Sequence, residues 1–204
     1  MNDNGLLIVI SGPSGCGKDT IIGEVLKKTG DEAFLSVSMT TRAKRDFEED
    51  GVHYYFVSEE QFKSNIENDL MLEYAQYGSN YYGTPIGPIR DLLEKGKTVI
   101  LNIEVTGGKN VRRLLPQAVQ IFVAPPSLEE LERRLYGRGS ESPEEILKRM
   151  NIAKEEMNHA CDYDYIVVND ELSKAVDDVM AIIRASKLKK EKTISKLCEV
   201  IKNA

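Results

Sequence analysis

The sequence predicts a three-layer α/β fold with a parallel central sheet. The first sign is a set of short runs of branched apolar residues, which indicate strands buried on both faces. These runs are 6–10, 97–105, 118–126 and 163–170. Segments with helical spacing separate them, and strands that alternate with helices favour a parallel sheet. The stretch from about 38 to 87 is aromatic, polar and partly alternating, and it predicts an inserted lobe.

The first elements follow in order from their local patterns. After LLIVI (6–10) comes a glycine-rich turn, and then a helix over 19–30 in which Gly30 suits the C-terminal end. The segment from residue 34 begins as a strand and becomes basic. The segment 51–57 alternates polar and aromatic residues, which is typical of an exposed antiparallel strand.

The remaining lobe and core elements have clear end signals. Ser58 is a predicted N-cap with Gln61 at the capping-box position, so 58–72 predicts a helix, followed by a strand and turn over 72–85. A helix is predicted over 86–96, ending at Gly96. The later predicted helices are 111–115, 127–139 behind the capping Ser127, 142–160 with Pro143 after the capping Ser142, and 172–190.

Length and composition narrow the class of protein. A chain of 204 residues with 41% hydrophobic and 29% charged residues predicts one folded domain. The net charge of −6 argues against a protein that coats nucleic acid. No run reaches the ~18 apolar residues of a membrane span. The cysteines Cys16, Cys161 and Cys198 have no paired spacing, and the N-terminus lacks a signal peptide pattern, so a cytoplasmic location is expected.

The segment GPSGCGKDT (12–20), here called the phosphate loop, lies between the first strand and the first helix. It nearly matches the phosphate-binding pattern G-x-x-x-x-G-K-[ST] through Gly12, Gly17 and Lys18. Glycines allow backbone N–H groups to point inward, and the helix N-terminus favours anions. Asp19 stands where a hydroxyl is usual. It either marks an inactive site or faces Mg²⁺, directly or through water, while the Thr20 hydroxyl remains for a phosphate.

The predicted lobe carries a second set of phosphate-binding side chains. Arg42 and Arg45 flank Lys44, and an arginine fork binds phosphate oxygens in pairs. Tyr54, Tyr81 and Tyr82 can add phenolic hydrogen bonds. From composition alone, a solvated basic edge with surface tyrosines explains these residues equally well.

Several motifs in order resemble the guanylate kinase family, in its bacterial form. They are ISGPSGCGK, SVSMTTR, LEYAQYGSNYYGTP, APPSLEELERRLYGRG and YDYIVVND, and the resemblance spans about residues 6 to 186. It implies a P-loop kinase fold with an inserted mixed lobe that binds GMP, a core that holds MgATP and a short helical lid. The implied divisions are a core of about 5–37, 88–126 and 163–187, a lobe of about 38–87, a lid of about 136–150 and an extension of about 188–204.

The resemblance also implies roles for individual residues. The implied catalytic residues are Lys18, Arg42, Arg134, Arg138 and Arg149. The implied ATP-binding residues are Gly12, Pro13, Ser14, Gly15, Cys16, Gly17, Lys18, Asp19, Thr20 and Asn169, with Asp170 in the same turn. The implied GMP-binding residues are Ser38, Arg42, Arg45, Tyr54, Glu73, Tyr82, Thr84 and Glu104, with Glu48 as an arginine partner.

The chain departs from the family pattern around both substrates. The family motif D-x-D-x-Q-G is here NIEVTG, with Asn102 and Glu104 in the places of the two acids, and Phe47 replaces a glycine. Asp19 is an added acid and Asn102 a lost one, which leads to the hypothesis that a carboxylate has moved from strand to loop. The tail has Ile194, Leu197, Val200 and Ile201 at helical spacing, which favours packing on the body or an oligomer contact.

The resemblance predicts ATP-dependent phosphorylation of GMP and dGMP with Mg²⁺, and no role for a nucleic acid polymer or a membrane. Two alternatives remain at this point. One is a kinase of the same fold with another acceptor, and the other is a non-catalytic interaction module. The intact Lys18 and glycines argue against the module, and Ser38 with Glu73 argue against a sugar acceptor.

Overall fold

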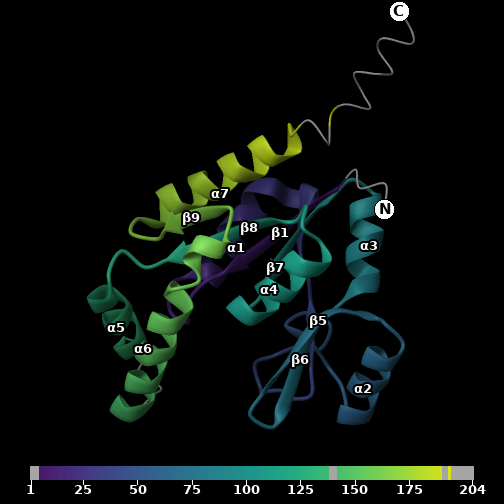
Figure 1. Cartoon of the computed structure of the whole chain (residues 1–204), viewed down its shortest axis with the longest axis horizontal. Coiled ribbons are helices and arrows are strands. Elements are labelled where there is room, and N and C mark those ends of the chain that lie inside the picture. Colours follow the sequence, from purple (N-terminus) through teal and green to yellow (C-terminus); the bar gives the residue numbers. More distant parts are fainter. Residues whose placement is uncertain (1–4, 138–141, 190–192, 194–204) are drawn as a thin grey trace, which may run out of the picture.

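The computed structural model describes residues 5–137, 142–189 and 193. In this part of the chain, a five-stranded parallel sheet has the order β2-β7-β1-β8-β9 (Figure 1). Its strands are β1 (Leu6–Ser11), β2 (Ala33–Leu35), β7 (Thr98–Asn102), β8 (Val119–Ala124) and β9 (Tyr165–Val168). The α/β fold with a parallel central sheet is therefore confirmed.

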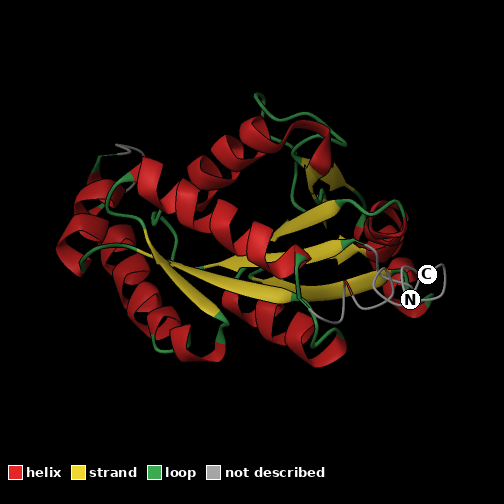
Figure 2. Ribbon diagram, turned by 90° about the horizontal axis from the view of Figure 1, so that it is seen from above, coloured by secondary structure: helices red, strands yellow, loops and turns green. Residues whose placement is uncertain are grey.

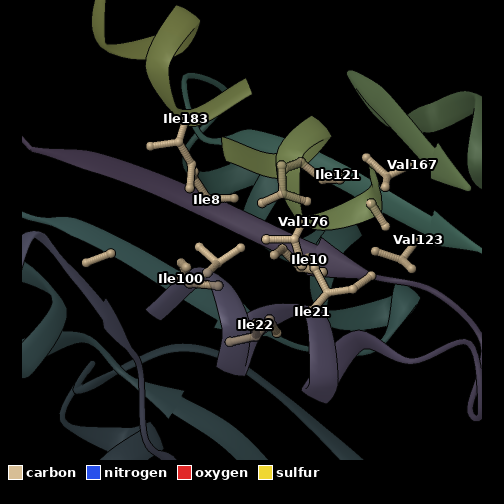
Figure 3. Packing of buried hydrophobic residues seen from close by; sticks show 14 of the residues in the cluster. Ile8, Ile10, Ile21, Ile22, Ile100, Ile121, Val123, Val167, Val176 and Ile183 are labelled. Carbon is tan, nitrogen blue, oxygen red and sulfur yellow. The ribbon is translucent and has the colours of Figure 1, made fainter. Parts of the chain in front are cut away.

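Helices cover both faces of this sheet (Figure 2). The helices packed on it are α1 (Lys18–Thr29), α3 (Ile86–Glu94), α4 (Val105–Leu114) and α7 (Leu172–Lys187). The other described helices are α2 (Glu59–Glu67), α5 (Leu128–Tyr136) and α6 (Pro143–Met157), with short 3₁₀ turns η1 (Gly30–Glu32) and η2 (Ala160–Asp162). Ile8 and Ile10 of β1 face a buried cluster with α1 and α7 (Figure 3). Leu7 and Val9 face a second cluster with α3 and α4, since side chains alternate along a strand.

A second, mixed sheet has the order β4-β3-β6-β5. Its strands are β3 (Ser38–Thr40), β4 (Tyr54–Phe56), β5 (Met71–Tyr77) and β6 (Asn80–Pro85). The expectation of an antiparallel strand over 51–57 is wrong, because β4 pairs in parallel with β3. An alternating pattern reports that one face is exposed and does not fix the direction of the neighbouring strand.

Two further strand predictions need correction. The run 97–105 is not one strand, because β7 ends at Asn102 and α4 begins at Val105. The run 163–170 is not buried on both faces, because β9 is an edge strand in which Ile166 is 55% exposed. Apolar residues continue past the end of β7 because Ile103 and Val105 are themselves buried beyond it.

The helix ends follow the predicted capping signals. Ser58 accepts a hydrogen bond from the Gln61 backbone N–H, and the Gln61 side chain accepts one from the Ser58 backbone N–H. Ser127 caps α5, and Ser142 caps α6 ahead of Pro143. Helices α5 and α6 enclose a small apolar cluster of their own around Leu131, Leu135 and Ile146.

The functional residues lie where these parts face one another. Figure 1 shows the mixed sheet with α2 and the α5–α6 pair projecting from the same side of the core. No helix in the described residues is long and apolar enough to cross a membrane. The predicted tail helix with Ile194 and Leu197 lies outside the described residues.

Candidate functional site

The phosphate loop connects β1 to α1 through glycines with unusual backbone angles. Gly12, Gly15 and Gly17 have φ values of 145°, 91° and 93°, which side-chain-bearing residues rarely adopt. A Cβ on Gly12 would clash with the Val123 carbonyl oxygen, and one on Gly17 would clash with the Asn169 amide. The local sequence therefore permits a tight loop that ends at the N-terminus of α1.

Lys18 begins α1 and turns back toward the loop. Its Nζ donates to the carbonyl oxygens of Gly12, at 2.5 Å, and Pro13, at 3.1 Å. The ammonium group is half-buried, so it places a positive charge beside a helix N-terminus that already favours anions. Cys16 is fully buried under the loop, and burial raises the pKa of its thiol.

A cavity of about 310 Å³ opens on the outer side of the phosphate loop. Its lining residues are Gly15, Gly17, Thr20, Arg134, Asn169, Asp170 and Leu172. The Asn169 amide donates to the Cys16 carbonyl oxygen at 2.8 Å, which ties the cavity wall to the loop. Arg134 donates to the Asn169 carbonyl oxygen at 3.0 Å and to Glu130 at 2.7 Å.

A larger cavity, of about 540 Å³, lies between the phosphate loop and the mixed sheet, and we call it the cleft cavity. Its lining residues are Ser14, Ser38, Arg42, Arg45, Glu48, Tyr54, Glu73, Ala75, Tyr82, Gly83, Asn102, Ile103, Glu104, Gly107 and Arg149. The structure thus brings together seven of the eight residues predicted for the second substrate. The eighth, Thr84, is fully buried and contacts the cavity through Glu73.

One end of the cleft cavity is basic. Arg42 makes a two-point contact with Glu48, with distances of 3.0 Å from Nη1 to Oε2 and 2.7 Å from Nη2 to Oε1. The Arg45 backbone N–H also donates to Glu48, at 2.8 Å. The Arg42 hydrogen bonds are the main cause that lowers the pKa of Glu48 to about 2. The Arg42 guanidinium lies 5.6 Å from the Tyr54 ring centroid, within cation–π range.

A second part of the lining, which we call the enclosed end, is acidic and buried. Glu73 is only 7% exposed, and its Oε1 accepts a hydrogen bond from the Thr84 hydroxyl at 2.6 Å. Burial is the main cause that raises the pKa of Glu73, and the nearby Glu104 carboxylate adds to the rise. A Cβ on Gly107 would come within 2.8 Å of Glu73 Oε2. The absence of a side chain at residue 107 therefore leaves the second carboxylate oxygen accessible.

The first turn of α1 and the end of β7 meet at the side of the cleft cavity. The Asn102 amide nitrogen donates to Asp19 Oδ1 over 2.6 Å. Asn102 lines the cleft cavity, whereas Asp19 is exposed beside Lys18. The structure therefore places Asp19, the added acid, in direct contact with Asn102, which stands in place of a family acid.

Helix α6 brings two charged groups over the site. Arg149 donates to the Ser14 hydroxyl at 3.2 Å and so lies over the phosphate loop. Glu156, which the sequence reasoning missed, follows seven residues later on the same helix face. Burial raises the pKa of Glu156 to about 7, with Glu104 adding to the rise and Lys18 opposing it. The spacing of seven from Arg149 was the sequence signal that could have revealed it.

Other predicted site residues lie elsewhere. Tyr81 stacks on Phe62 with ring centroids 5.4 Å apart and does not line the cleft cavity. Phe47 is 74% exposed on the loop between β3 and β4. Arg138 lies outside the described residues. Gly107 and Ile103 line the cleft cavity and were missed, because their motif was judged only by its polar positions.

Comparison with known proteins gives one consistent family. The family model described as guanylate kinase matches residues 4–186. A guanylate kinase from Halalkalibacterium halodurans is 49% identical over 199 residues, which cover 98% of this chain and 97% of that protein.

Solved structures agree with that match. A guanylate kinase structure from Anaplasma phagocytophilum has a TM-score of 0.77 and 31% identity, with 96% of this chain and 94% of that chain covered. A structure of TT1252 from Thermus thermophilus has a TM-score of 0.50 at 18% identity, covers 89% of this chain and 97% of that chain, and shares the fold.

Proposed function

The chain belongs to the guanylate kinase family, and we propose that it transfers the γ-phosphoryl group of ATP to GMP or dGMP. The observation that carries the proposal is the polarity of the cleft cavity. Its basic end with Arg42 and Arg45 fits a phosphate monoester, and its enclosed end with Glu73 fits a base that donates hydrogen bonds. GMP has both features at opposite ends of one molecule.

The basic end would hold the acceptor phosphate. Arg42 contacts Glu48 on one side and the Tyr54 ring on another. These contacts hold the guanidinium in one orientation, which also sets the direction of its remaining N–H donors. Arg45 and Tyr82 line the same cavity, Arg45 with a backbone bond to Glu48 and Tyr82 with its ring centroid 6.1 Å from that of Tyr54. A phosphate monoester is already ionised at neutral pH, so the acceptor needs no general base, and no catalytic histidine is required of this site.

The enclosed end would select guanine. Guanine presents neighbouring N1–H and N2–H₂ donors, and a single carboxylate can accept from both. Glu73 supplies that carboxylate, with Ser38 and Glu104 lining the same cavity. Adenine presents an acceptor at N1, which would leave Glu73 without a donor in a buried place.

The outer cavity and the phosphate loop would hold ATP. Backbone N–H groups of the loop and Lys18 would bind the phosphates, and the cavity beside Asn169 would take the adenine end. Arg134 and Arg149 approach the loop from α5 and α6, where they can neutralise charge as the phosphoryl group moves. A phosphate oxygen of GMP attacks the γ-phosphorus while the bond to the β–γ bridging oxygen breaks, giving GDP and ADP.

The side chains at the phosphate loop fit a magnesium ion that accompanies ATP. Mg²⁺ prefers carboxylate oxygens and keeps several waters besides substrate phosphates, so it needs few protein ligands. Asp19 offers such an oxygen next to Lys18. When bound, the ion would neutralise charge on the β- and γ-phosphates. Asp19 would hold it directly or through water.

Two alternatives have less support. A non-catalytic module would not need Lys18 at the mouth of the loop or an arginine that reaches Ser14. The family match, together with Ser38 and Glu73 in the cleft cavity, favours a guanine base over a sugar phosphate acceptor.

The direct test of transfer is to incubate the protein with γ-labelled ATP, Mg²⁺ and GMP and to identify the labelled product. The proposal expects label in GDP, with one ADP formed per GDP. ADP formed without labelled GDP would contradict it, because water and not GMP would then be the acceptor.

A further inference from the structure

The contact between Asp19 and Asn102 joins two elements that are far apart in the chain. Asp19 is the second residue of α1, and Asn102 is the last residue of β7. The amide nitrogen of Asn102 donates to Asp19 Oδ1 at 2.6 Å. Such a short, charge-assisted bond restricts an exposed acid that would otherwise sample several rotamers.

The strand end that carries Asn102 belongs to the central sheet. Asn102 pairs in register with Ile10 of β1, the strand that leads into the phosphate loop. The amide is therefore held by the same central strands that hold the loop. One hydrogen bond from Asn102 connects the Asp19 carboxylate to this sheet.

The pair lies where the cleft cavity meets the phosphate loop. Asn102 lines the cleft cavity, and Asp19 follows Lys18 directly. Asp19 Oδ2 has no hydrogen-bond partner within residues 5–137 and 142–189. The Asp19 charge also reaches the cleft cavity, because it adds to the rise in the pKa of Tyr54 that burial mainly causes.

We propose that Asp19 and Asn102 work as one exchanged pair, in which Asn102 is a positioning residue that aims the Asp19 carboxylate at the divalent ion of the donor nucleotide. The inference rests on the proposed use of MgATP and concerns the contact between Asp19 and Asn102. The pair carries one negative charge and one amide. Either position can supply the carboxylate, provided that the other supplies the amide that donates to it.

The test exchanges the two side chains. Four proteins are compared: the parent, Asp19→Asn, Asn102→Asp, and the double variant Asp19→Asn/Asn102→Asp, which keeps the hydrogen bond and the net charge. The measurement is the affinity for ADP by calorimetry, with and without Mg²⁺ and without any acceptor. The quantity compared is the factor by which Mg²⁺ tightens ADP binding.

We expect Asp19→Asn to reduce this factor by at least about fivefold. The double variant should recover it to within about twofold of the parent, because substitutions at two contacting residues need not have additive effects. Asn102→Ala retains the acid but removes its donor, so it should give an intermediate reduction. Asn102→Asp places two carboxylates together and should lower the thermal midpoint in the absence of Mg²⁺, with recovery when Mg²⁺ is added. Asp31→Asn, which removes an exposed acid near the far end of α1, is the charge-matched control.

A double variant no better than Asp19→Asn would overturn the inference, and so would a parent whose ADP affinity is the same with and without Mg²⁺. These outcomes are separate from a failure of the proposed function. The calorimetry contains no GMP, so a protein that binds MgADP through this pair but does not phosphorylate GMP would contradict the acceptor assignment alone.

Discussion

The Thr84 hydroxyl donates to the Glu73 carboxylate over 2.6 Å, and both residues are buried at the enclosed end of the cleft cavity. The two residues face each other across the β5–β6 hairpin, where they pair in register. Thr84 therefore orients the carboxylate through one hydrogen bond and leaves its remaining lone pairs for a ligand. The position of Glu73 is set by the hairpin before any substrate arrives.

Glu73→Gln should lower kcat/KM for GMP. The loss of transition-state stabilisation should be about 1–3 kcal/mol, the cost of leaving a buried polar group badly paired. An amide in place of the carboxylate can accept only one of the two guanine donors. MgATP affinity should change little. The measurement is steady-state kinetics with GMP varied, with Glu67→Gln on the exposed side of α2 as the matched control. Unchanged GMP kinetics would remove Glu73 from the base site.

Thr84→Val keeps the side-chain shape and removes the hydrogen-bond donor. Because the Thr84 hydroxyl lowers the pKa of Glu73 against the effect of burial, its loss should raise that pKa further. At neutral pH, kcat/KM for GMP should fall by an amount that corresponds to about 1 kcal/mol. It should recover as the pH rises and Glu73 ionises. A pH profile of kcat/KM identical to that of the parent would show that Thr84 does not act through Glu73.

Lys18→Ala should lower turnover by at least about 10²-fold, because it removes a fixed positive charge from the transferring phosphates. GMP affinity should remain close to that of the parent, since Lys18 does not line the cleft cavity. Lys27→Ala, on the same helix and paired with Glu24, is the control. Equal turnover in Lys18→Ala and the parent would exclude the phosphate loop from the reaction.

The Arg42–Glu48 pair makes a prediction for acid stability. The pKa of Glu48 is lowered from 4.5 to about 2 in the folded protein, mainly by Arg42. The ionised carboxylate therefore stabilises the fold above about pH 4.5, and this contribution is lost as pH falls toward 2. The thermal midpoints of the parent and Glu48→Gln should differ at pH 7 and converge below pH 4.5. A difference that does not depend on pH would show that the pair does not titrate as described.

Glu156 should affect the pH dependence of stability in the opposite direction to Glu48. Burial raises its pKa from 4.5 to about 7, so the folded protein favours the protonated form. The resulting stability is present below pH 4.5 and is lost as pH rises through 7. Relative to the parent, Glu156→Gln should become more stable between pH 5 and pH 8. Glu155→Gln, an exposed neighbour on α6, should show no such trend.

Much of the fold could be predicted because local signals agreed with the final structure. The apolar run before Gly12 forms the central strand, and the Ser58 and Gln61 side chains form the expected capping box. Such signals depend on residues close in sequence, which local patterns report well. The parallel pairing of β4 with β3 could not be predicted, since it depends on how the whole lobe folds back.

The sequence could predict which residues lie together where one motif holds them. The phosphate loop and the pair Arg42 and Arg45 are of this kind, and the cleft cavity is lined by most of the residues named for the acceptor, whose roles stay predictions. The hydrogen bond between Asp19 and Asn102 joins residues far apart in the chain, so sequence could suggest only that their charges had exchanged. The pKa of Glu156 depends on its burial and on the charges of Glu104 and Lys18, which lie far from it in the chain, so no local pattern contains it.

The central claim is that the cleft cavity selects guanine, and a panel of acceptors tests it most directly. ADP release from MgATP is measured with GMP, dGMP, AMP, CMP and UMP under the same conditions. Sites that recognise a substrate through buried hydrogen bonds can reject an analogue by about 10⁴-fold or more, so kcat/KM for GMP and dGMP should exceed that for the other three by this order. AMP as good an acceptor as GMP would contradict the account, because Glu73 would then have no role in choosing the base.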